Sequence, residues 1–536
     1  MEAQDLKCML RNKIFLIGIL GLALFLRLYN FGGNPSSLYW EEVALGYDAY
    51  SILKTGADHH GHFLPIVALE SFGDWKPALY AYAIIPFIPL FDLGAIAVRL
   101  PSLLAGLSLL FALYLIAKKL GQNPLLVLAI TAISPWAIQF SRVGWEAHLA
   151  TACITWGLYF GIATVGEKKK IQIRHFALSV FFLILSLYTY HAARIVAPVV
   201  GLSIILFITS SLGFKSVLGT WKKMLFIILL AFVAVVPLLA KISSPEILQR
   251  SRETSIFSDV SIILESNQLK EQARNSLLSR LIYHRYVLFS QEIIKNGLAQ
   301  FTPRYLFLSG DPQIRHSVQF FGHLYHIEAI FLILGFFVWL KKRTKLHLLL
   351  FFVAILSVLP AAISTGSPHA LRSMTLFPIL MLLAAEGIQM ILSLVRARKL
   401  LFTAVVVLIV GAYTAELSAF WLYYNDIYPK VAASEWQYGY AEMVQSLEQK
   451  MQENPDLPVY VSRAMGRPAM YYWFYTKTDP RLVQAANATA KKDQGEFLEF
   501  GGIEFVNSES ELPQDDSPKI VASPITGENS WTIEVR

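Results

Sequence analysis

The 536-residue chain has little cysteine and little charge. Its two cysteines, Cys8 and Cys153, imply neither a disulfide framework nor thiol chemistry. Charged residues make up 16% of the chain, against 55% hydrophobic residues, and the mean hydropathy is +0.48. This balance excludes a string of soluble domains. Apolar runs of about 18 residues or more recur, and each can cross ~30 Å of hydrocarbon. The sequence therefore predicts a polytopic helical protein of the cell membrane.

About eleven apolar runs form the predicted membrane spans. No small-residue cleavage site follows the first run, so we expect it to be retained and not removed as a signal peptide. The apolar stretch 78–90 is short and carries Pro86 and Pro89, and we expect it to lie along the outer interface, like residues 43–53. The predicted spans are 14–31, 97–117, 124–140, 147–165, 175–190, 195–213, 223–240, 326–340, 346–363, 373–395 and 400–422.

Short basic clusters between the predicted spans set the topology. With these spans every cluster falls on one side of the membrane, which the positive-inside rule identifies as the cytoplasm. The N-terminus is then cytoplasmic, and the net charge of +8 requires no nucleic acid. The clusters are Lys7, Arg11 and Lys13; Lys118 and Lys119; Lys168, Lys169 and Lys170; Lys222 and Lys223; Lys341, Lys342, Arg343 and Lys345; and Arg396, Arg398 and Lys399.

Polar residues that are unusual beside a bilayer gather in the segments that this topology places outside. These segments are the first outer loop 32–96, the large outer loop 241–325 and three turns near 141–148, 189–195 and 364–373. Because such residues are costly there unless they serve a function, the asymmetry predicts one site at the outer face. The residues are Glu41, Glu42, Lys76, Arg142, Glu146, His148, His191, Arg194, Arg315, His316, His369 and Arg372.

The composition changes after Asn425 to that of an ordinary soluble domain. Residues 435–452 read as an amphipathic helix, and 458–463, 502–506 and 518–522 read as strands. We therefore predict an all-α transmembrane catalytic domain over 1–424 and a small extracytoplasmic α/β domain over 425–536.

The outer residues suit one kind of chemistry. Paired acids such as Glu41 and Glu42 act as a general base or as ligands of a divalent cation. Arginine, lysine and histidine supply the fixed donors that a phosphate needs while negative charge develops on it. Together they predict group transfer from a lipid phosphate whose hydrocarbon lies between helices.

An ordered set of motifs resembles a known family, the multi-span GT-C glycosyltransferases of the bacterial family-39 type, which are related to protein O-mannosyltransferases and to the aminoarabinose transferases of lipid A. The resemblance covers residues 14 to about 424. The motifs are Trp40-Glu41-Glu42, Gly61 to Pro65, Gly73-Asp74-Trp75-Lys76-Pro77, Arg99-Leu100-Pro101-Ser102, Ser134-Pro135 with Ser141-Arg142, Tyr188-Thr189-Tyr190-His191, Gly310-Asp311-Pro312 with Arg315-His316, and Pro368-His369-Ala370-Leu371-Arg372.

The resemblance implies a GT-C fold and an inverting transfer of a hexose or pentose from a polyprenyl-phosphate donor to an acceptor hydroxyl of a protein, lipid or glycan. It implies Glu41 as the base and Glu42 as its neighbour, but the family more often has Asp first, so their roles could be exchanged. Lys76, Arg372 and Arg142 are the expected ligands of the donor phosphate. The other candidates for substrate binding are Asp74, Glu146, Tyr190, His191, Arg194, Arg315, His316 and His369.

Several plainer interpretations stay open. The acidic pair could only stabilise the start of an interfacial helix, and Arg142 with Glu146 could be a helix-end ion pair. The acidic pair could also hold a divalent cation, and no other cofactor or metal is implied. The run 58–62, with one aspartate and three histidines, lacks a downstream partner spacing, so we expect a solvated loop there. The alternative functions are a secondary transporter, although we find no internal repeat, and a polysaccharide polymerase or ligase.

Overall fold

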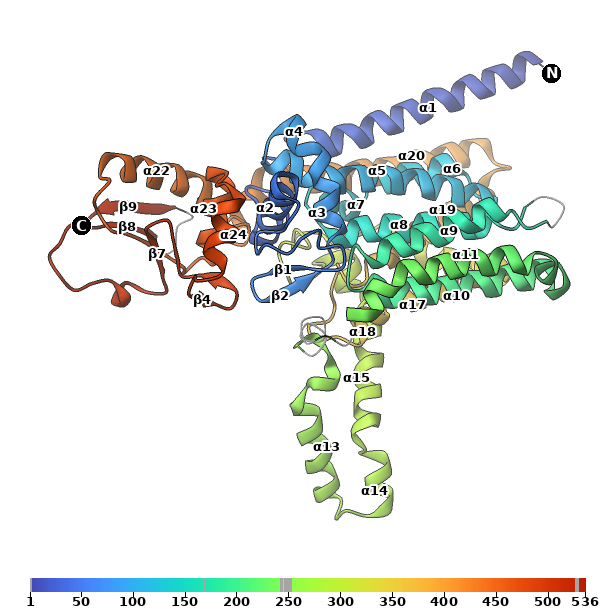
Figure 1. Cartoon of the computed structure of the whole chain (residues 1–536). Coiled ribbons are helices and arrows are strands. Elements are labelled where there is room, and N and C mark those ends of the chain that lie inside the picture. The colour runs from blue at the N-terminus through green and yellow to red at the C-terminus, as the bar shows by residue number, and fades with distance from the viewer. Residues whose placement is uncertain (1, 167–169, 242–243, 245–252, 526–529) are drawn as a thin grey trace. The chain divides into compact units, whose positions relative to one another are not determined.

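The computed structural model describes residues 2–166, 170–241, 244, 253–525 and 530–536 (Figure 1). Lys168 and Lys169 of one predicted basic cluster lie outside these residues. The chain divides into two compact units. The helical unit comprises residues 1–26, 105–139 and 147–421, and the mixed unit comprises residues 27–104, 140–146 and 422–536.

All of the apolar runs predicted as spans are helical. One of them, 124–140, is divided at Ser134, whose backbone is extended because the ring of Pro135 disfavours a helical residue before it. The helices that lie wholly or mostly in the helical unit are α1 (Glu2–Leu28), α5 (Ala95–Leu120), α6 (Pro124–Ile133), α7 (Pro135–Phe140), α8 (Glu146–Ala163), α9 (Ile173–Leu187), α10 (Ala193–Leu212), α11 (Phe214–Lys241), α16 (Glu328–Lys342), α17 (Lys345–Ser357), α18 (Leu359–Ala362), η5 (Met374–Leu376), α19 (Phe377–Val395) and α20 (Lys399–Leu422).

Six helical segments among the described residues are long and apolar enough to cross a membrane. Shorter apolar helices are found at Leu79–Phe91, Pro124–Ile133 and Ile173–Leu187. The fold is therefore that of a multi-pass membrane protein, while the number of about eleven spans and the cytoplasmic N-terminus stay predictions. The six segments are Ala95–Leu120, Ala193–Leu212, Leu218–Lys241, Lys345–Ala362, Met374–Val395 and Lys399–Val431.

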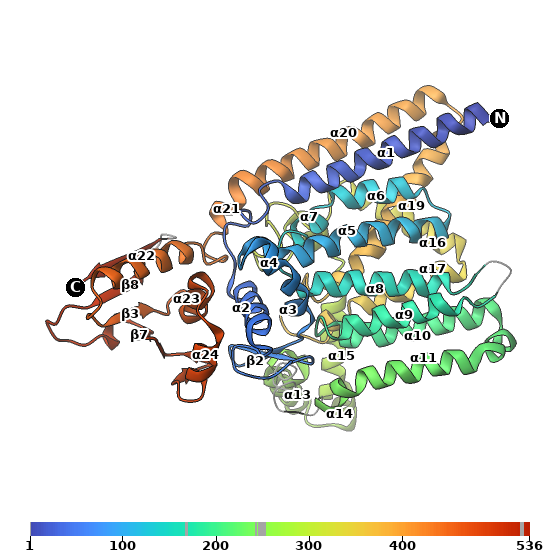
Figure 2. The same ribbon diagram turned by 45° about the horizontal axis from the view of Figure 1, so that its top comes forward.

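Helices α16 and α19 pack most closely at two glycines. A Cβ atom on Gly335 would lie 2.0 Å from the carbonyl oxygen of Leu383, and one on Gly387 would lie 2.0 Å from that of Phe331. Only glycine allows the two backbones this approach, which is how apolar helices gain packing energy without a hydrophobic driving force between them. Helices α9, α10, α11 and α17 lie side by side elsewhere in the same unit (Figures 1 and 2).

The predicted large outer loop 241–325 contains helices that the sequence analysis did not predict. Its elements are η3 (Ile256–Ser258), α13 (Val260–Gln272), α14 (Leu277–Ile282), α15 (Arg285–Ala299) and a π-helical turn, η4 (Arg304–Leu308). Side chains cap the three α-helices: Asp259 accepts from the N–H of Ser261, Ser276 from that of Ser279 and His284 from that of Tyr286. Helices α13 and α15 pack against each other (Figure 1).

In the mixed unit, helix α2 (Trp40–Thr55) is followed by a hairpin of strands β1 (Leu69–Ser71) and β2 (Asp74–Lys76). Phe72 and Gly73 both have positive φ, which gives the two-residue turn that matches the twist of the strands. The stretch predicted to lie along the interface forms three short pieces, α3 (Leu79–Ile84), η1 (Ile85–Phe87) and α4 (Ile88–Phe91), with Pro86 and Pro89 in the first turns of the last two.

The remainder of the mixed unit is an α/β assembly. Its main sheet has the order β6-β7-β3-β8-β9, in which β3 pairs in parallel with β7 and β8 while the outer pairs are antiparallel. Helix α22 packs against β8, β9 and α23. The elements are η6 (Tyr423–Ile427), α21 (Tyr428–Val431), α22 (Tyr440–Glu453), β3 (Val459–Ser462), α23 (Pro468–Thr476), α24 (Pro480–Asn487), β4 (Lys492–Asp493), β5 (Glu496–Phe497), β6 (Glu499–Phe500), β7 (Ile503–Val506), η7 (Glu509–Glu511), β8 (Ile520–Pro524) and β9 (Trp531–Val535).

Candidate functional site

Glu42 lies in the first turn of α2 and is completely buried. Arg99, from the first turns of α5, faces it with two parallel bonds: Nε donates to Oε1 at 2.9 Å and Nη2 donates to Oε2 at 3.1 Å. The same guanidinium also donates to the carbonyl oxygens of Pro35 and Ser37, at 3.1 and 2.5 Å. This bidentate, charge-assisted pair fixes the geometry of Glu42, because the other N–H groups of Arg99 are also hydrogen-bonded.

A backbone group completes the surroundings of Glu42. The N–H of Gly144 donates to Oε1 at 2.7 Å. A Cβ atom on residue 144 would lie 3.2 Å from both Cγ and Oε1 of Glu42, so glycine gives the backbone this close approach. Glu42 therefore accepts three bonds from Arg99 and Gly144, and it is held as a fixed anion and not exposed to a substrate.

Glu41, the preceding residue, has different surroundings. Its side chain is 28% exposed, and it forms an ion pair with Lys76 at the end of β2. The Lys76 side chain is only 11% exposed. The first-turn position of α2 and the two-residue hairpin bring together a partly exposed carboxylate and a nearly buried ammonium group from residues 35 positions apart in sequence.

Arg142, predicted as a phosphate ligand, is completely buried and holds the chain between α1 and α2. Its guanidinium donates to the carbonyl oxygens of Arg27, Asn30 and Asn34 at 3.1 to 3.3 Å. It also lies over the ring of Tyr424, 5.5 Å from the centroid. These contacts describe a structural role, and phosphate binding by Arg142 stays a prediction.

The other two predicted residues of the mixed unit lie at element boundaries. Asp74 begins β2, and its Oδ1 accepts from the N–H of Trp75 at 2.8 Å. Glu146 begins α8 and is half-buried. The structure therefore pairs Glu41 with Lys76, whereas substrate binding by Asp74 and Glu146 stays a prediction.

The remaining predicted residues belong to the helical unit. Arg194, near the start of α10, donates to the carbonyl oxygen of Leu187 at 3.2 Å and lies 3.4 Å from Nδ1 of His191. Arg372 donates to the carbonyl oxygen of Thr365 at 2.7 Å. Tyr190 and His191 are half-buried between α9 and α10, and Arg315 is half-buried next to His316. Their roles in substrate binding stay predictions.

His316 and His369 lie close together around Asp311, which was not among the predicted site residues. His316 Nδ1 lies 3.0 Å and His369 Nδ1 lies 3.9 Å from Oδ2 of Asp311. Burial would raise the pKa of Asp311, but the charge and hydrogen bond of His316 and the nearby His369 hold it well below its usual range. Within the described residues, these three side chains form the group that could hold a metal ion. The acidic pair, where a divalent cation was considered, forms ion pairs with Arg99 and Lys76, and cation binding there stays a prediction.

The run 58–62 is not the solvated loop that we expected. Asp58, His59 and His60 are buried. His59 Nδ1 lies 2.6 Å from Oδ1 of Asp48, and His60 Nδ1 lies 2.9 Å from Oδ1 of Asn487. Burial raises the pKa of Asp48 to about 7 and lowers those of His59 and His60 to about 4. The prediction was wrong because side chains distant in sequence bury this loop.

Two residues of the clusters were missed although sequence signals pointed to them. Arg99 is a cation at the start of an apolar run of membrane-spanning length, which by itself predicts a buried partner. Asp311 stands in the quoted motif Gly310-Asp311-Pro312, but no role was given to it. Their partners Glu42 and Ala370 lie 57 and 59 residues away, so spacing could not reveal either contact.

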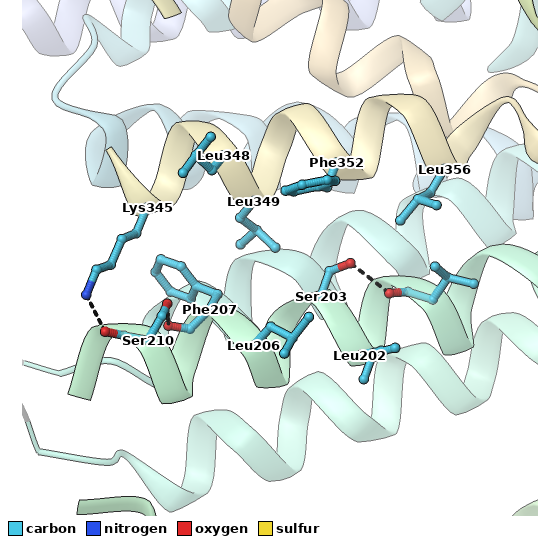
Figure 3. A pocket seen from close by; sticks show the side chains of 11 residues that line it. Leu202, Ser203, Leu206, Phe207, Ser210, Lys345, Leu348, Leu349, Phe352 and Leu356 are labelled. Carbon is cyan, nitrogen blue, oxygen red and sulfur yellow. Dashed lines mark hydrogen bonds between the residues drawn. The ribbon is translucent and has the colours of Figure 1, made fainter. Parts of the chain in front are cut away.

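An apolar cavity of about 650 Å³ opens between α10 and α17 in the helical unit (Figure 3). Leu206, Leu349 and Phe352 are among its lining side chains, and Lys345 lies at one end, donating to the carbonyl oxygen of Ser210. None of the predicted site residues lines it. Its mainly apolar lining suits hydrocarbon.

Comparison with solved structures relates this fold to two glycosyltransferases. The structure of ArnT from Cupriavidus metallidurans bound to undecaprenyl phosphate is similar with a TM-score of 0.54 and 12% identity, over 95% of this chain and 92% of that chain. The apo structure of the same protein gives 0.53 and 13%, over 96% and 93%. An oligosaccharyltransferase of Archaeoglobus fulgidus tethered to an acceptor peptide gives 0.50 and 12%, over 87% and 63%.

No protein-family model matches the sequence, and no curated protein matches it either. Both similar proteins have the GT-C fold, so the fold that the ordered motifs implied is confirmed for this chain. At 12–13% identity the similarity establishes the fold alone.

Proposed function

We propose that the protein is a membrane glycosyltransferase that transfers a sugar from a polyprenyl-phosphate donor to an acceptor hydroxyl with inversion. One observation carries the proposal: of two adjacent acids, Glu42 is fixed in a completely buried ion pair, while Glu41 is partly exposed and paired with Lys76. A general base must reach a substrate proton, and a leaving phosphate needs a cation nearby. Glu41 and Lys76 offer both from adjoining elements.

The proposed reaction uses one base and one fixed cation. Glu41 takes the proton of the acceptor hydroxyl, and the oxygen attacks the anomeric carbon from the face opposite the phosphate. The bond between that carbon and the phosphate oxygen breaks, and the polyprenyl phosphate leaves with the electron pair. Lys76 stabilises the charge that develops on the phosphate, so no separate acid is required. The proton stays on Glu41 until water removes it.

Glu42, Arg99 and Gly144 are positioning residues in this proposal. Their buried contacts fix the first turn of α2 and hence the place of Glu41. Arg142 acts in the same way on the segment before α2, through the carbonyl groups of Arg27, Asn30 and Asn34. A base held by rigid neighbours loses little entropy when the substrates bind.

The lipid-linked donor is supported by the fold and by the membrane. A protein with the same fold is described with undecaprenyl phosphate bound, and this chain has six helical segments suited to a bilayer. We extend the proposal to the topology: a cytoplasmic N-terminus, with loop 32–96 and the extracytoplasmic domain 425–536 on the outer side. Single cysteines placed in a cysteine-free variant test this by labelling intact cells, and labelling only from the cytoplasmic side would contradict it.

The reaction itself is tested with the purified full-length protein. Wild-type protein incubated with polyprenyl-phosphate sugars and mixed cell-envelope acceptors should release polyprenyl phosphate and form a product of inverted anomeric configuration, read by NMR. Glu41→Gln should abolish release, while Glu265→Gln, at an exposed residue of α13, serves as the matched control and should leave it unchanged. Coupled uptake of a solute into proteoliposomes without sugar release would favour a transporter instead.

A further inference from the structure

The cluster of Asp311, His316 and His369 lies where two segments of the helical unit meet, and no step of the proposed transfer uses it. Asp311 and His316 follow η4, whereas His369 belongs to the turn before η5 and α19. Their ligand atoms lie within 4.8 Å of one another. Asp311 and His316 are nearly completely buried, and the His369 side chain is 20% exposed.

The separations suit one small cation. Zinc binds imidazole nitrogen and carboxylate oxygen at about 2.0–2.2 Å, so two ligands of one ion lie at most about 4.2 Å apart. The distances from Asp311 Oδ2 to Nδ1 of His316 and of His369, 3.0 and 3.9 Å, fall inside that limit. Two imidazoles and one carboxylate also favour a transition metal over magnesium or calcium, which prefer oxygen ligands.

Backbone N–H groups around the cluster hydrogen-bond to Asp311 and hold the turn that carries His369. The N–H of Gln313 donates to Oδ1 of Asp311 at 2.8 Å, and the N–H of Ala370 donates to Oδ2 at 2.6 Å. The turn that carries His369 is fixed by the bond of its N–H to Oε1 of Gln300. Hydrogen bonds of this kind orient the ligands of a metal before it binds.

A second observation also indicates a ligand. His323 is 1% exposed, and its Nε2 has no hydrogen-bond partner among the described residues. This atom lies 3.6 Å from where a Cβ atom of Gly310, the neighbour of Asp311, would be. Its ring is fixed between Trp136 and Tyr305, at centroid distances of 4.3 and 4.6 Å. A buried polar atom without a partner is rare and requires an explanation.

We propose that Asp311, His316 and His369 form a zinc-binding site that joins the end of the large outer loop to the turn before α19. The ion neutralises the buried carboxylate and connects two segments that the chain separates by 53 residues or more. To bind through Nδ1, His316 takes the tautomer with its proton on Nε2, so zinc replaces the bond between His316 and Asp311. The site is structural, and its existence does not depend on the proposed transfer reaction.

The experiment measures zinc on the purified full-length protein. Metal-free wild-type protein in detergent is titrated with ZnCl₂, and bound metal is counted by mass spectrometry after desalting. We expect one equivalent of zinc, a higher thermal unfolding temperature with zinc and its reversal by a chelator. Asp311→Asn, His316→Gln and His369→Gln should each weaken binding by about 100-fold or more, since even supporting residues typically contribute 10–100-fold.

The control variant is His284→Gln, at an exposed histidine outside the cluster, which should still bind one equivalent. Cobalt in place of zinc gives a visible spectrum that reports the ligands, and this spectrum should change in the His316 and His369 variants. Failure of the wild-type protein to bind zinc, or unchanged binding in the three variants, would overturn the proposal. Tighter binding of magnesium than of zinc would overturn it as well. Wild-type zinc binding and its chelator reversal are informative even if a variant does not fold.

Discussion

Two buried carboxylates, Glu42 in the mixed unit and Asp311 in the helical unit, are neutralised in different ways. Glu42 is 0% exposed and bonded to a guanidinium, whose charge is permanent at any physiological pH. Asp311 is 3% exposed and faces two imidazoles, a type of side chain that binds metal ions. Both accept additional bonds from backbone N–H groups.

The difference indicates what each region can do. A permanent, bidentate pair offers no open ligand position, which suits the proposed role of Glu42 in positioning the neighbouring Glu41. The Asp311 region offers a carboxylate and two imidazoles as ligand groups, which suits a binding site. Glu42 and Asp311 are therefore almost equally buried but suit different roles, because one is paired with a guanidinium and the other with imidazoles.

Removing the guanidinium should have the largest effect. Arg99→Met leaves Glu42 as a buried anion without its counter-ion, which typically costs about 3–5 kcal/mol. We expect a large fall in the thermal unfolding temperature of the detergent-solubilised protein and loss of transfer activity. Arg304→Met, at an exposed arginine, is the matched control. A stability equal to that of the control would show that the pair is not structural, and the comparison with Asp311 would then fail.

Truncating the other carboxylate should cost less when metal is absent. Asp311→Ala leaves the buried N–H groups of Gln313 and Ala370 without their acceptor, and an unsatisfied buried donor costs about 1–3 kcal/mol. In metal-free protein we expect a moderate destabilisation, smaller than that of Arg99→Met. Urea unfolding curves of both variants measure the order, and a reversed order would contradict the assignment of roles.

The smallest expected effect is a pH dependence in the loop between α2 and β1. Burial lowers the pKa of His60 to about 4, against about 6.5 for the unfolded chain. Below pH 6.5 the unfolded chain therefore binds more protons than the folded one, and stability falls as the pH drops toward 4. We expect His60→Gln to remove a pH-dependent loss on the order of 1 kcal/mol at pH 5. His284→Gln should keep the wild-type slope, and an unchanged slope in His60→Gln would contradict the burial argument.

Much of the fold could be predicted because hydrophobicity is local. Each apolar run read from the sequence is helical, and the strands expected at 458–463 and 502–506 lie at Val459–Ser462 and Ile503–Val506. The helices inside loop 241–325 were missed, since they are short and their polar faces conceal the pattern. The sequence analysis also did not predict helix α24 or the short strands β1, β2, β4, β5, β6 and β9. The ordered motifs then implied the GT-C fold that the structural similarity confirms.

The site was only partly predictable because its contacts are long-range. The pairing of Glu41 with Lys76 agrees with the expected grouping of an acid and a cation. The guanidinium of Arg99 and the burial of His60 by Asn487 depend on partners 57 and 427 residues away, which no spacing indicates. The sequence does not distinguish Glu41 from Glu42, and the difference between them is visible only from their contacts with Lys76 and Arg99.

The central claim is that these two adjacent acids divide catalysis and stability between them. Comparing Glu41→Gln and Glu42→Gln in one experiment, with both the rate of polyprenyl phosphate release and the unfolding temperature measured, tests it most directly. We predict that Glu41→Gln loses at least ~100-fold in rate with a smaller fall in the unfolding temperature than Glu42→Gln, because the Glu42 side chain is completely buried while that of Glu41 is partly exposed. A Glu41→Gln protein that releases polyprenyl phosphate at the wild-type rate would contradict the account.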